Sequence, residues 1–177
     1  MRKSGLPSVV DGNTEILILG TLPSDKSLAV GQYYANPGND FWMLVGAALD
    51  KSIDGLSYED KLELLKANRV GLWDAYHSCI RPGSMDADIT ERELNDFAVL
   101  KGLAPKLRLV CFNGQKAIGA RESLVRLGYH TRLLPSSSGA NRRDQARRLS
   151  RWKEAIHFDA SLFKERHNSN EDLRLFR

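Results

Sequence analysis

Short apolar runs alternate with segments of helical periodicity along most of the chain. Four runs have the length and composition of strands buried in a sheet, at residues 15–20, 69–74, 108–114 and 129–134. Apolar residues recur at helical spacing elsewhere, which predicts helices over residues 41–49, 57–68, 90–100, 115–127 and 142–158. Strands that alternate with helices predict βαβ units, in which helices cover both faces of a parallel sheet.

Capping residues support three of the predicted helices. Asn39 stands just ahead of the helix expected from residue 41, and Ser57 is placed to cap the next helix. Thr90 and Glu93 match the S/T-x-x-E capping box, which predicts that a helix begins there.

The loops at the carboxyl ends of the strands hold the most informative segments. They follow Gly20, residues 113–114 and Leu134. The sequence contains no internal repeat, low-complexity tract or linker that would divide it. We therefore expect one domain over residues 1–177, with the polar segment 159–177 as a peripheral tail.

Composition and charge narrow the class of protein. With 42% hydrophobic and 27% charged residues in 177, the chain has the composition of a soluble globular domain. Residues 1–100 hold 9 basic and 15 acidic side chains, whereas residues 101–177 hold 17 and 7, so the basic part suggests a polyanionic partner. The chain lacks both an apolar run near the ~18 residues that span a bilayer and a signal peptide, which predicts a cytoplasmic protein without membrane contact.

Metal sites and phosphate-binding loops find no support in the sequence. Cys79 and Cys111 are too few for a four-cysteine iron–sulfur cluster and belong to no C-x-x-C motif. The four histidines lack the H-x-x-x-H spacing, and neither G-x-x-x-x-G-K-[ST] nor G-x-G-x-x-G occurs. We expect chemistry without a bound metal, or with one that the substrate holds. The loop after Gly20 is instead rich in aromatic and amide side chains, which suit a planar ring.

Four blocks of sequence, in order, resemble the uracil-DNA glycosylase superfamily. The first has the form G-x-x-P from Gly20, and segment 36–42 (Asn-Pro-Gly-Asn-Asp-Phe-Trp) is similar to the H-P-x-N-x-F-W run of its mismatch-specific members. Residues within 72–89 are similar to a block of the hypoxanthine (deoxyinosine) DNA glycosylase branch. Segments 112–117 and 134–141 match two further blocks.

The resemblance implies a three-layer α/β/α fold around a mainly parallel four-stranded sheet. It implies a monofunctional enzyme without a cofactor that hydrolyses the N-glycosidic bond of a deaminated base, hypoxanthine or uracil, in DNA. Such an enzyme flips the base out of the duplex, and a positioned water attacks the sugar. The implied partner is DNA that contains deaminated bases, and we expect a nucleoid-associated monomer. A non-catalytic DNA-binding relative of the same fold is the alternative.

Asn39 is the candidate for positioning the water. Many superfamily members use an asparagine or aspartate in the first motif, but the corresponding residue here is Leu22, which we assign to the base-binding site. The resemblance transfers the role to Asn39, whose amide orients water without acting as a strong base. The same side chain can also cap the helix that follows. Asp40 replaces a basic residue of relatives, and either tunes the attack or is a first-turn acid that the helix dipole stabilises.

Tyr34 and Asn113 are the candidates for holding the flipped base. Relatives place a stacking aromatic residue at the position of Tyr34, although Tyr33 and Tyr34 are also typical core residues. Asn113 ends a predicted strand and can present its amide to a base edge, or it can simply form a turn before Gly114. Hypoxanthine and uracil both offer a carbonyl beside an N–H, so one amide complements either base.

The segment after Leu134 is the candidate contact to the DNA backbone. Its small polar residues suit hydrogen bonds to phosphate, and a basic run follows. Relatives often place a bulky apolar wedge in this loop, but Ala140 stands at that position. The residues that we assign to DNA binding are Ser136, Ser137, Ser138, Asn141, Arg142 and Arg143.

Overall fold

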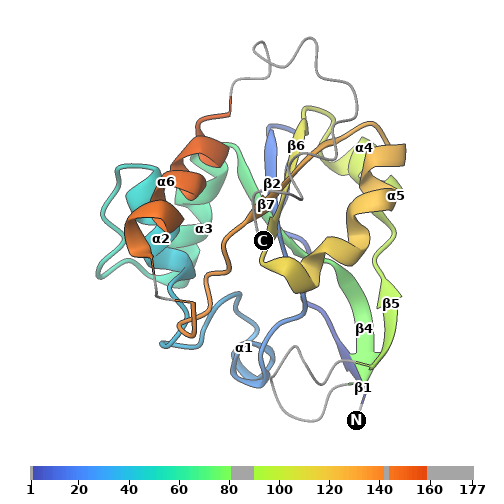
Figure 1. The fold of residues 1–177 in the computed structure, drawn as a ribbon, viewed down its shortest axis with the longest axis horizontal. Helices are drawn as coiled ribbons and strands as arrows, with labels where there is room; N and C mark the ends of the chain where they lie inside the picture. The colour runs from blue at the N-terminus through green and yellow to red at the C-terminus, as the bar shows by residue number, and fades with distance from the viewer. Residues whose placement is uncertain (1, 81–89, 142–143, 159–177) are drawn as a thin grey trace.

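Four parallel strands form the central sheet of the computed structural model, which describes residues 2–80, 90–141 and 144–158 (Figure 1). The strand order is β3-β2-β6-β7, and every neighbouring pair is parallel. All four strands arise from the apolar runs predicted to form them. Their bounds are β2 Ile16–Gly20, β3 Val70–Asp74, β6 Leu109–Asn113 and β7 His130–Leu134.

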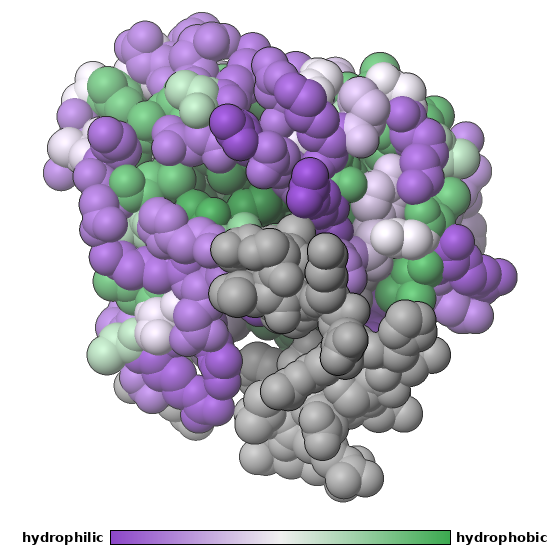
Figure 2. Space-filling model, turned by 90° about the horizontal axis from the view of Figure 1, so that it is seen from above, coloured by the Kyte–Doolittle hydropathy of each residue, from purple (hydrophilic) through white to green (hydrophobic). Residues whose placement is uncertain are grey.

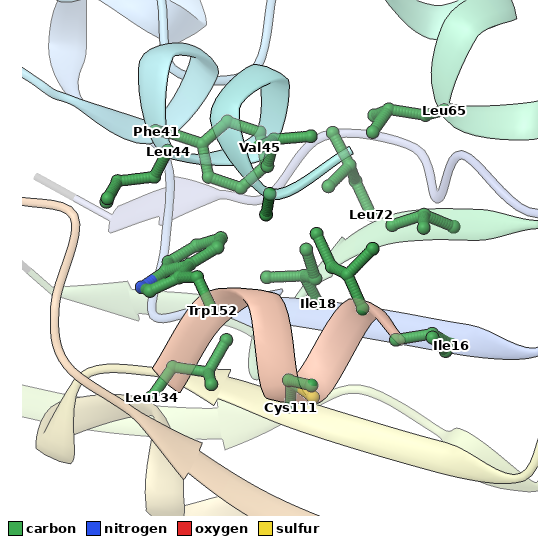
Figure 3. Close-up of a cluster of buried hydrophobic side chains, with 14 of the residues drawn as sticks. Ile16, Ile18, Phe41, Leu44, Val45, Leu65, Leu72, Cys111, Leu134 and Trp152 are labelled. Atoms are coloured by element: carbon green, nitrogen blue, oxygen red, sulfur yellow. The ribbon is translucent and has the colours of Figure 1, made fainter. Parts of the chain in front are cut away.

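Three helices cover one face of this sheet: α2 (Phe41–Ala48), α3 (Tyr58–Ala67) and α6 (Gln145–Ile156). Figure 3 shows the side chains of this layer, with Trp152 of α6 lying between the sheet and α2. The Trp152 indole is fully buried, and its N–H donates to the carbonyl of Pro135 at 3.0 Å. This side chain therefore ties α6 to the loop that follows β7.

The other face is covered by shorter elements. They are the 3₁₀ helix η2 (Phe97–Val99), α4 (Leu100–Leu103), the 3₁₀ helix η3 (Gln115–Ala120) and α5 (Arg121–Arg126). Helices on both faces give the three-layer α/β/α architecture that was expected, although the predicted helix over 115–127 is divided between η3 and α5.

A second, antiparallel sheet was not predicted. It consists of β1 (Arg2–Ser4), β4 (Tyr76–Ile80) and β5 (Thr90–Leu94), in the order β1-β4-β5. The prediction of a helix from Thr90 is therefore wrong. β5 pairs along β4, and the Ser78 hydroxyl of β4 donates to Glu93, so strand pairing outweighs the local capping pattern.

One face of the molecule is mainly polar. Seen from above, hydrophilic residues cover most of it, with hydrophobic residues visible between them (Figure 2). Across the part of the chain that the structure describes, every helix is too short or too polar to cross a membrane. Arg142, Arg143 and the expected peripheral tail at 159–177 lie outside the described residues.

The parallel strands bring their carboxyl ends to one edge of the sheet. Gly20 of β2 pairs with Asp74 of β3, and Asn113 of β6 pairs with Leu134 of β7. The helix α1 (Asp25–Val30) follows β2 at this edge. The loops after β2, β6 and β7 therefore meet here, as the sequence predicted.

Candidate active site

Tyr34 presents an aromatic ring at the carboxyl edge. Its ring stacks on Phe41 of α2 with the centroids 3.7 Å apart and the planes within 6° of parallel. One face of the Tyr34 ring is thus covered by the core. The backbone adopts φ +55°, a conformation that is rare outside glycine and that sets the direction of the side chain.

The residue before Tyr34, Tyr33, is held in place by contacts of its hydroxyl with Asp74 and Leu6. Tyr33 is buried, and its hydroxyl lies 3.2 Å from Oδ2 of Asp74 and 3.1 Å from the carbonyl of Leu6. Burial, and then the charge of Asp74, raise the pKa of Tyr33 well above its ordinary value. The phenol therefore stays neutral and keeps its hydrogen bond throughout the physiological pH range.

Asn113 is hydrogen-bonded on both sides of its amide. The nitrogen Nδ2 donates to the Tyr34 hydroxyl at 3.0 Å and to the Ser137 hydroxyl at 2.7 Å, while Oδ1 accepts the Ser137 backbone N–H at 2.8 Å. This last bond fixes which end of the amide is oxygen. Both N–H groups are used and one Oδ1 lone pair remains, so a base carbonyl must displace one of the two hydroxyls to reach Nδ2.

A glycine allows β6 to approach the loop of residues 135–141, which follows β7 and is called the serine loop below. Gly114 has φ +90°, and a Cβ added to it would lie 2.9 Å from the Cβ of Ser136. Any other residue would both strain the backbone and push the loop away from Asn113. The turn that the sequence indicated at residues 113–114 is therefore a requirement of the site.

Asn39 stands one residue before Asp40, the N-cap residue of α2, and its amide bonds to the first residue of the helix. Its Oδ1 accepts the N–H of Phe41 at 3.0 Å, and its backbone forms an antiparallel bridge with Ser138. The side chain is half-buried beside a cavity of about 340 Å³ that Tyr34 and Tyr58 also line. The hydrogen bond from the Phe41 N–H holds the amide in place at the start of α2.

Asp40 forms a buried ion pair with Arg148 of α6. The Oδ2 and Nη1 atoms are 2.8 Å apart, and the side chains are 10% and 2% exposed. The Asp40 backbone N–H donates to the carbonyl of Ser137 at 2.9 Å. Sequence reasoning missed this pair because Arg148 lies 108 residues from Asp40 within a run of arginines that resembles a solvated helix face.

The residues assigned to DNA binding divide into exposed and internal groups. Ser138 and Asn141 are exposed and Ser136 is half-buried. Ser137 is 1% exposed, and its hydroxyl bonds to Asn113. The structure thus places Ser137 inside the site, while Arg142 and Arg143 are outside the described residues.

The basic helix α6 is less open to phosphate than its charge suggests. Arg151 pairs with Glu154 at 3.1 Å, and Lys153 pairs with Asp50 at 2.7 Å. Arg148 is buried against Asp40. The basic run after the loop is therefore partly neutralised by Asp40 and Asp50, which flank α2, and by Glu154 of α6 itself.

Leu22 lies in the core at this edge. It is 7% exposed and belongs to the apolar cluster on the second face of the sheet. Within the described ranges, no three His, Cys, Asp or Glu side chains gather in a way that could hold a metal ion. The polar groups at the edge are amides, hydroxyls, the Asp40–Arg148 pair and the Asp74 carboxylate that Tyr33 contacts, and the amides and hydroxyls suit recognition of a neutral base and orientation of a water.

Comparisons with known proteins agree with this geometry. A sequence model of the Uracil DNA glycosylase superfamily matches residues 7–159. The chain is 56% identical over 154 residues to a hypoxanthine DNA glycosylase of Methanosarcina acetivorans, with 86% of this chain and 97% of that protein covered. It is 49% identical over 157 residues to a hypoxanthine DNA glycosylase of Methanosarcina barkeri, with 88% and 99% covered.

A solved structure has the same fold. It is a solution NMR structure of a provisionally assigned uracil DNA glycosylase from Methanosarcina acetivorans. The TM-score is 0.80 at 54% sequence identity, over 88% of this chain and 97% of that one.

Proposed function

The chain belongs to the uracil DNA glycosylase superfamily, and from this premise we propose that it removes hypoxanthine from DNA by hydrolysing the N-glycosidic bond. Two hypoxanthine DNA glycosylases match it at 49–56% identity over nearly their entire lengths. This similarity favours hypoxanthine over uracil, a choice that the residues alone left open. It also favours an enzyme over a non-catalytic DNA-binding relative.

One observation carries the proposal: Asn39 and Asn113, 74 positions apart, lie on either side of the same serine loop. Asn113 binds Ser137, and Asn39 bridges Ser138. Tyr34 adds its ring and its hydroxyl to this arrangement. A stacking platform, a base-reading amide and a water-orienting amide are thus held in one constellation.

Binding of the flipped base uses Tyr34 and Asn113. The base stacks on the face of the Tyr34 ring that lies opposite Phe41, so that Phe41, Tyr34 and the base form one stack. Asn113 Oδ1 accepts the N–H of the base, and Nδ2 exchanges one hydroxyl partner for the base carbonyl. This exchange replaces one hydrogen bond by another, so it costs little free energy. It favours binding of a base that carries both an N–H and a carbonyl.

Hydrolysis uses the amide of Asn39. A water that donates to Oδ1 directs its own lone pair toward the sugar carbon. As the new C–O bond forms, the electron pair of the glycosidic bond leaves with the base, and the proton that the water releases neutralises the departing base. Because an amide does not accept a proton near neutral pH, the contribution of Asn39 is orientation. The oxocarbenium character of the transition state makes such a weakly activated water sufficient.

Contacts to the DNA backbone come from the serine loop, with Ser136, Ser138 and Asn141 as the described donors. Together with the basic residues that follow, they predict salt-sensitive binding. If ~3 phosphates are neutralised, affinity falls ~40-fold between 50 and 200 mM salt. Fluorescence anisotropy of a labelled deoxyinosine duplex measures this slope, and binding indifferent to salt would contradict the backbone contact.

The experiment that tests the function uses the wild-type protein. Duplexes that contain deoxyinosine or deoxyuridine opposite each of the four bases are incubated with protein, and abasic sites are then cleaved with alkali. We expect cleavage of deoxyinosine duplexes after alkali only, because no lyase step takes place. Binding without product for either base would favour the non-catalytic alternative, and product from deoxyuridine alone would overturn the choice of hypoxanthine.

A further inference from the structure

The ion pair between Asp40 and Arg148 is unusual because it lies in the interior. Arg148 is 2% exposed, and in addition to Asp40 its guanidinium donates to Gln145 Oε1 at 3.3 Å and to the Ser138 carbonyl at 3.4 Å. Its Nε atom is buried without a hydrogen-bond partner among the described residues. Taking two charges out of water costs about as much as their attraction returns, so two apolar side chains would stabilise the fold at least as well.

The pair holds together the two segments that carry the candidate catalytic groups. Asp40 directly follows Asn39, and its N–H donates to the Ser137 carbonyl at 2.9 Å. Arg148 reaches the next carbonyl of the same loop, that of Ser138. The beginning of α2 is thereby fastened to the serine loop from two directions.

The orientation of the Asn39 amide depends on this same turn. Oδ1 is bound by the N–H of Phe41, and Asp40 lies between these two residues. A shift of Asp40 would therefore rotate the amide and loosen the Asn39–Ser138 bridge at once. Misplacement of a reacting group by about 1 Å can slow an enzymatic reaction ~100-fold.

We propose that Asp40 and Arg148 form a positioning pair that holds the Asn39 amide in its water-orienting geometry. The proposal rests on the proposed function, since it acts through the role given there to Asn39. Neither charge touches the substrate. The pair fixes the start of α2 relative to the serine loop, and through Ser137 it also fixes the partner of Asn113.

A second ion pair between the same two regions provides a matched control. Lys153 of α6 binds Asp50, which lies just beyond the far end of α2, with Nζ and Oδ1 2.7 Å apart. These side chains are 41% and 71% exposed and lie at the opposite end of α2 from Asn39. Removal of this pair changes the contact between α2 and α6 without touching the candidate site.

The test measures single-turnover excision from a deoxyinosine duplex, with the rate at saturating enzyme and the half-saturating concentration determined separately. Asp40→Asn keeps the shape of the side chain and removes its charge. We expect the saturated rate to fall ~10- to 100-fold while the half-saturating concentration changes less than ~3-fold. Asp50→Asn and Lys153→Met should stay within ~2-fold of wild type on both measures.

A double variant separates positioning from stability. Asp40→Asn with Arg148→Met leaves no unpaired charge in the interior, so its melting temperature should recover toward wild type. The excision rate should remain at least ~10-fold low, because the start of α2 is no longer fastened to the serine loop. The single variant Arg148→Lys keeps the positive charge, so its excision rate should lie between that of the double variant and that of wild type. Recovery of the rate together with stability in the double variant would overturn the proposal.

A third comparison asks whether the pair acts through Asn39. In an Asn39→Ala background, Asp40→Asn should slow excision by less than ~3-fold further, because the group that it positions is gone. If Asp40→Asn slows excision in the Asn39→Ala background as much as it does in the wild-type background, the proposed route through Asn39 is overturned. If Asn39→Ala alone leaves the rate at the wild-type level, both the role of Asn39 and this route are overturned, and a wild type without product overturns the function itself.

Discussion

The two ends of the central sheet both carry many polar groups, but they use them differently. At the carboxyl end, Asn113, Ser137, Asp40 and Arg148 bond to one another, and the two charged side chains are nearly inaccessible to solvent. At the amino end, an open cavity of about 620 Å³ is lined by Glu15 and a cluster of cations. The cations that line this cavity are Lys66, Arg69, Lys106 and Arg108.

The amino end has the greater charge but the weaker constraint. Its ion pair between Arg69 and Glu15, at 2.8 Å, joins side chains that are 63% and 35% exposed. Water competes with each such contact, and either side chain can move without cost to the other. Connectivity and burial, rather than charge density, therefore distinguish the candidate site from the rest of the polar surface.

Two replacements of an amide by alanine compare these ends, and Asn113→Ala at the carboxyl end should slow excision more than its counterpart at the amino end. Asn113→Ala removes the amide that joins Tyr34, the serine loop and the base, so excision should slow ~10- to 100-fold. The ratio between deoxyinosine and deoxyuridine should change little, because both bases present the same pair of groups to the amide. Single-turnover excision measures both quantities.

The matched control for this variant lies at the amino end. Asn13 accepts a hydrogen bond from Lys106 there, so Asn13→Ala also deletes an amide with a side-chain partner. Its excision rate should stay within ~2-fold of wild type. Equal losses in the two variants would show that the network at the carboxyl end has no special role.

The buried sheet between the two ends should make the free energy of unfolding depend on pH, an effect of intermediate size. Burial raises the pKa of the Cys111 thiol from 9.0 to about 12. The unfolded chain releases this proton above pH 9 and the folded chain does not, so the contribution is complete below pH 9 and is lost as the pH rises toward 12. Tyr33, whose pKa is also raised, adds a loss of the same sign above pH 10.

Urea unfolding at pH 8, 9 and 10 measures this dependence. Wild type should lose stability over the range, and Cys111→Ala should lose less, although the cavity left by the sulfur lowers its starting value. The Asn13→Ala control should follow the wild-type slope. A Cys111→Ala slope equal to that of wild type would show that the thiol does not contribute.

The smallest effect is expected at the exposed pair of the amino end. Arg69→Met or Glu15→Gln should change the free energy of unfolding by about 0–1 kcal/mol and leave excision unchanged. Chemical denaturation and the alkali cleavage assay check the two parts of this expectation. A strong loss of excision from either variant would mean that the amino end takes part in the reaction.

Much of the fold followed from local patterns in the sequence. The four buried strands are apolar runs that require burial on both faces, and Ser57 caps α3 as expected, with its hydroxyl accepting the N–H of Asp60 at 3.0 Å. The strand from Thr90 could not be found in this way. Its side chains are exposed, and its conformation is imposed by pairing with β4, the preceding strand of the chain.

The candidate site was predictable residue by residue but not as a network. The resemblance indicated Asn39, Tyr34 and Asn113, and the structure brings all three to one edge of the sheet. It did not indicate that Asn113 is held by Ser137, or that Asp40 and Arg148 are buried together. These contacts join segments 24 and 108 residues apart, and only the packing of α6 against α2 removes Arg148 from water.

The central claim is that the Asn39 amide orients the attacking water, and one comparison tests it most directly. Single-turnover excision from a deoxyinosine duplex is measured at saturating enzyme for wild type and Asn39→Ala, with duplex affinity and melting temperature measured on the same preparations. We expect the rate of Asn39→Ala to fall ~100-fold or more while affinity changes only a few-fold. Loss of the hydrogen bond from the Phe41 N–H should cost about 1 kcal/mol of stability. A folded Asn39→Ala variant that binds the duplex and excises hypoxanthine at the wild-type rate would contradict the account.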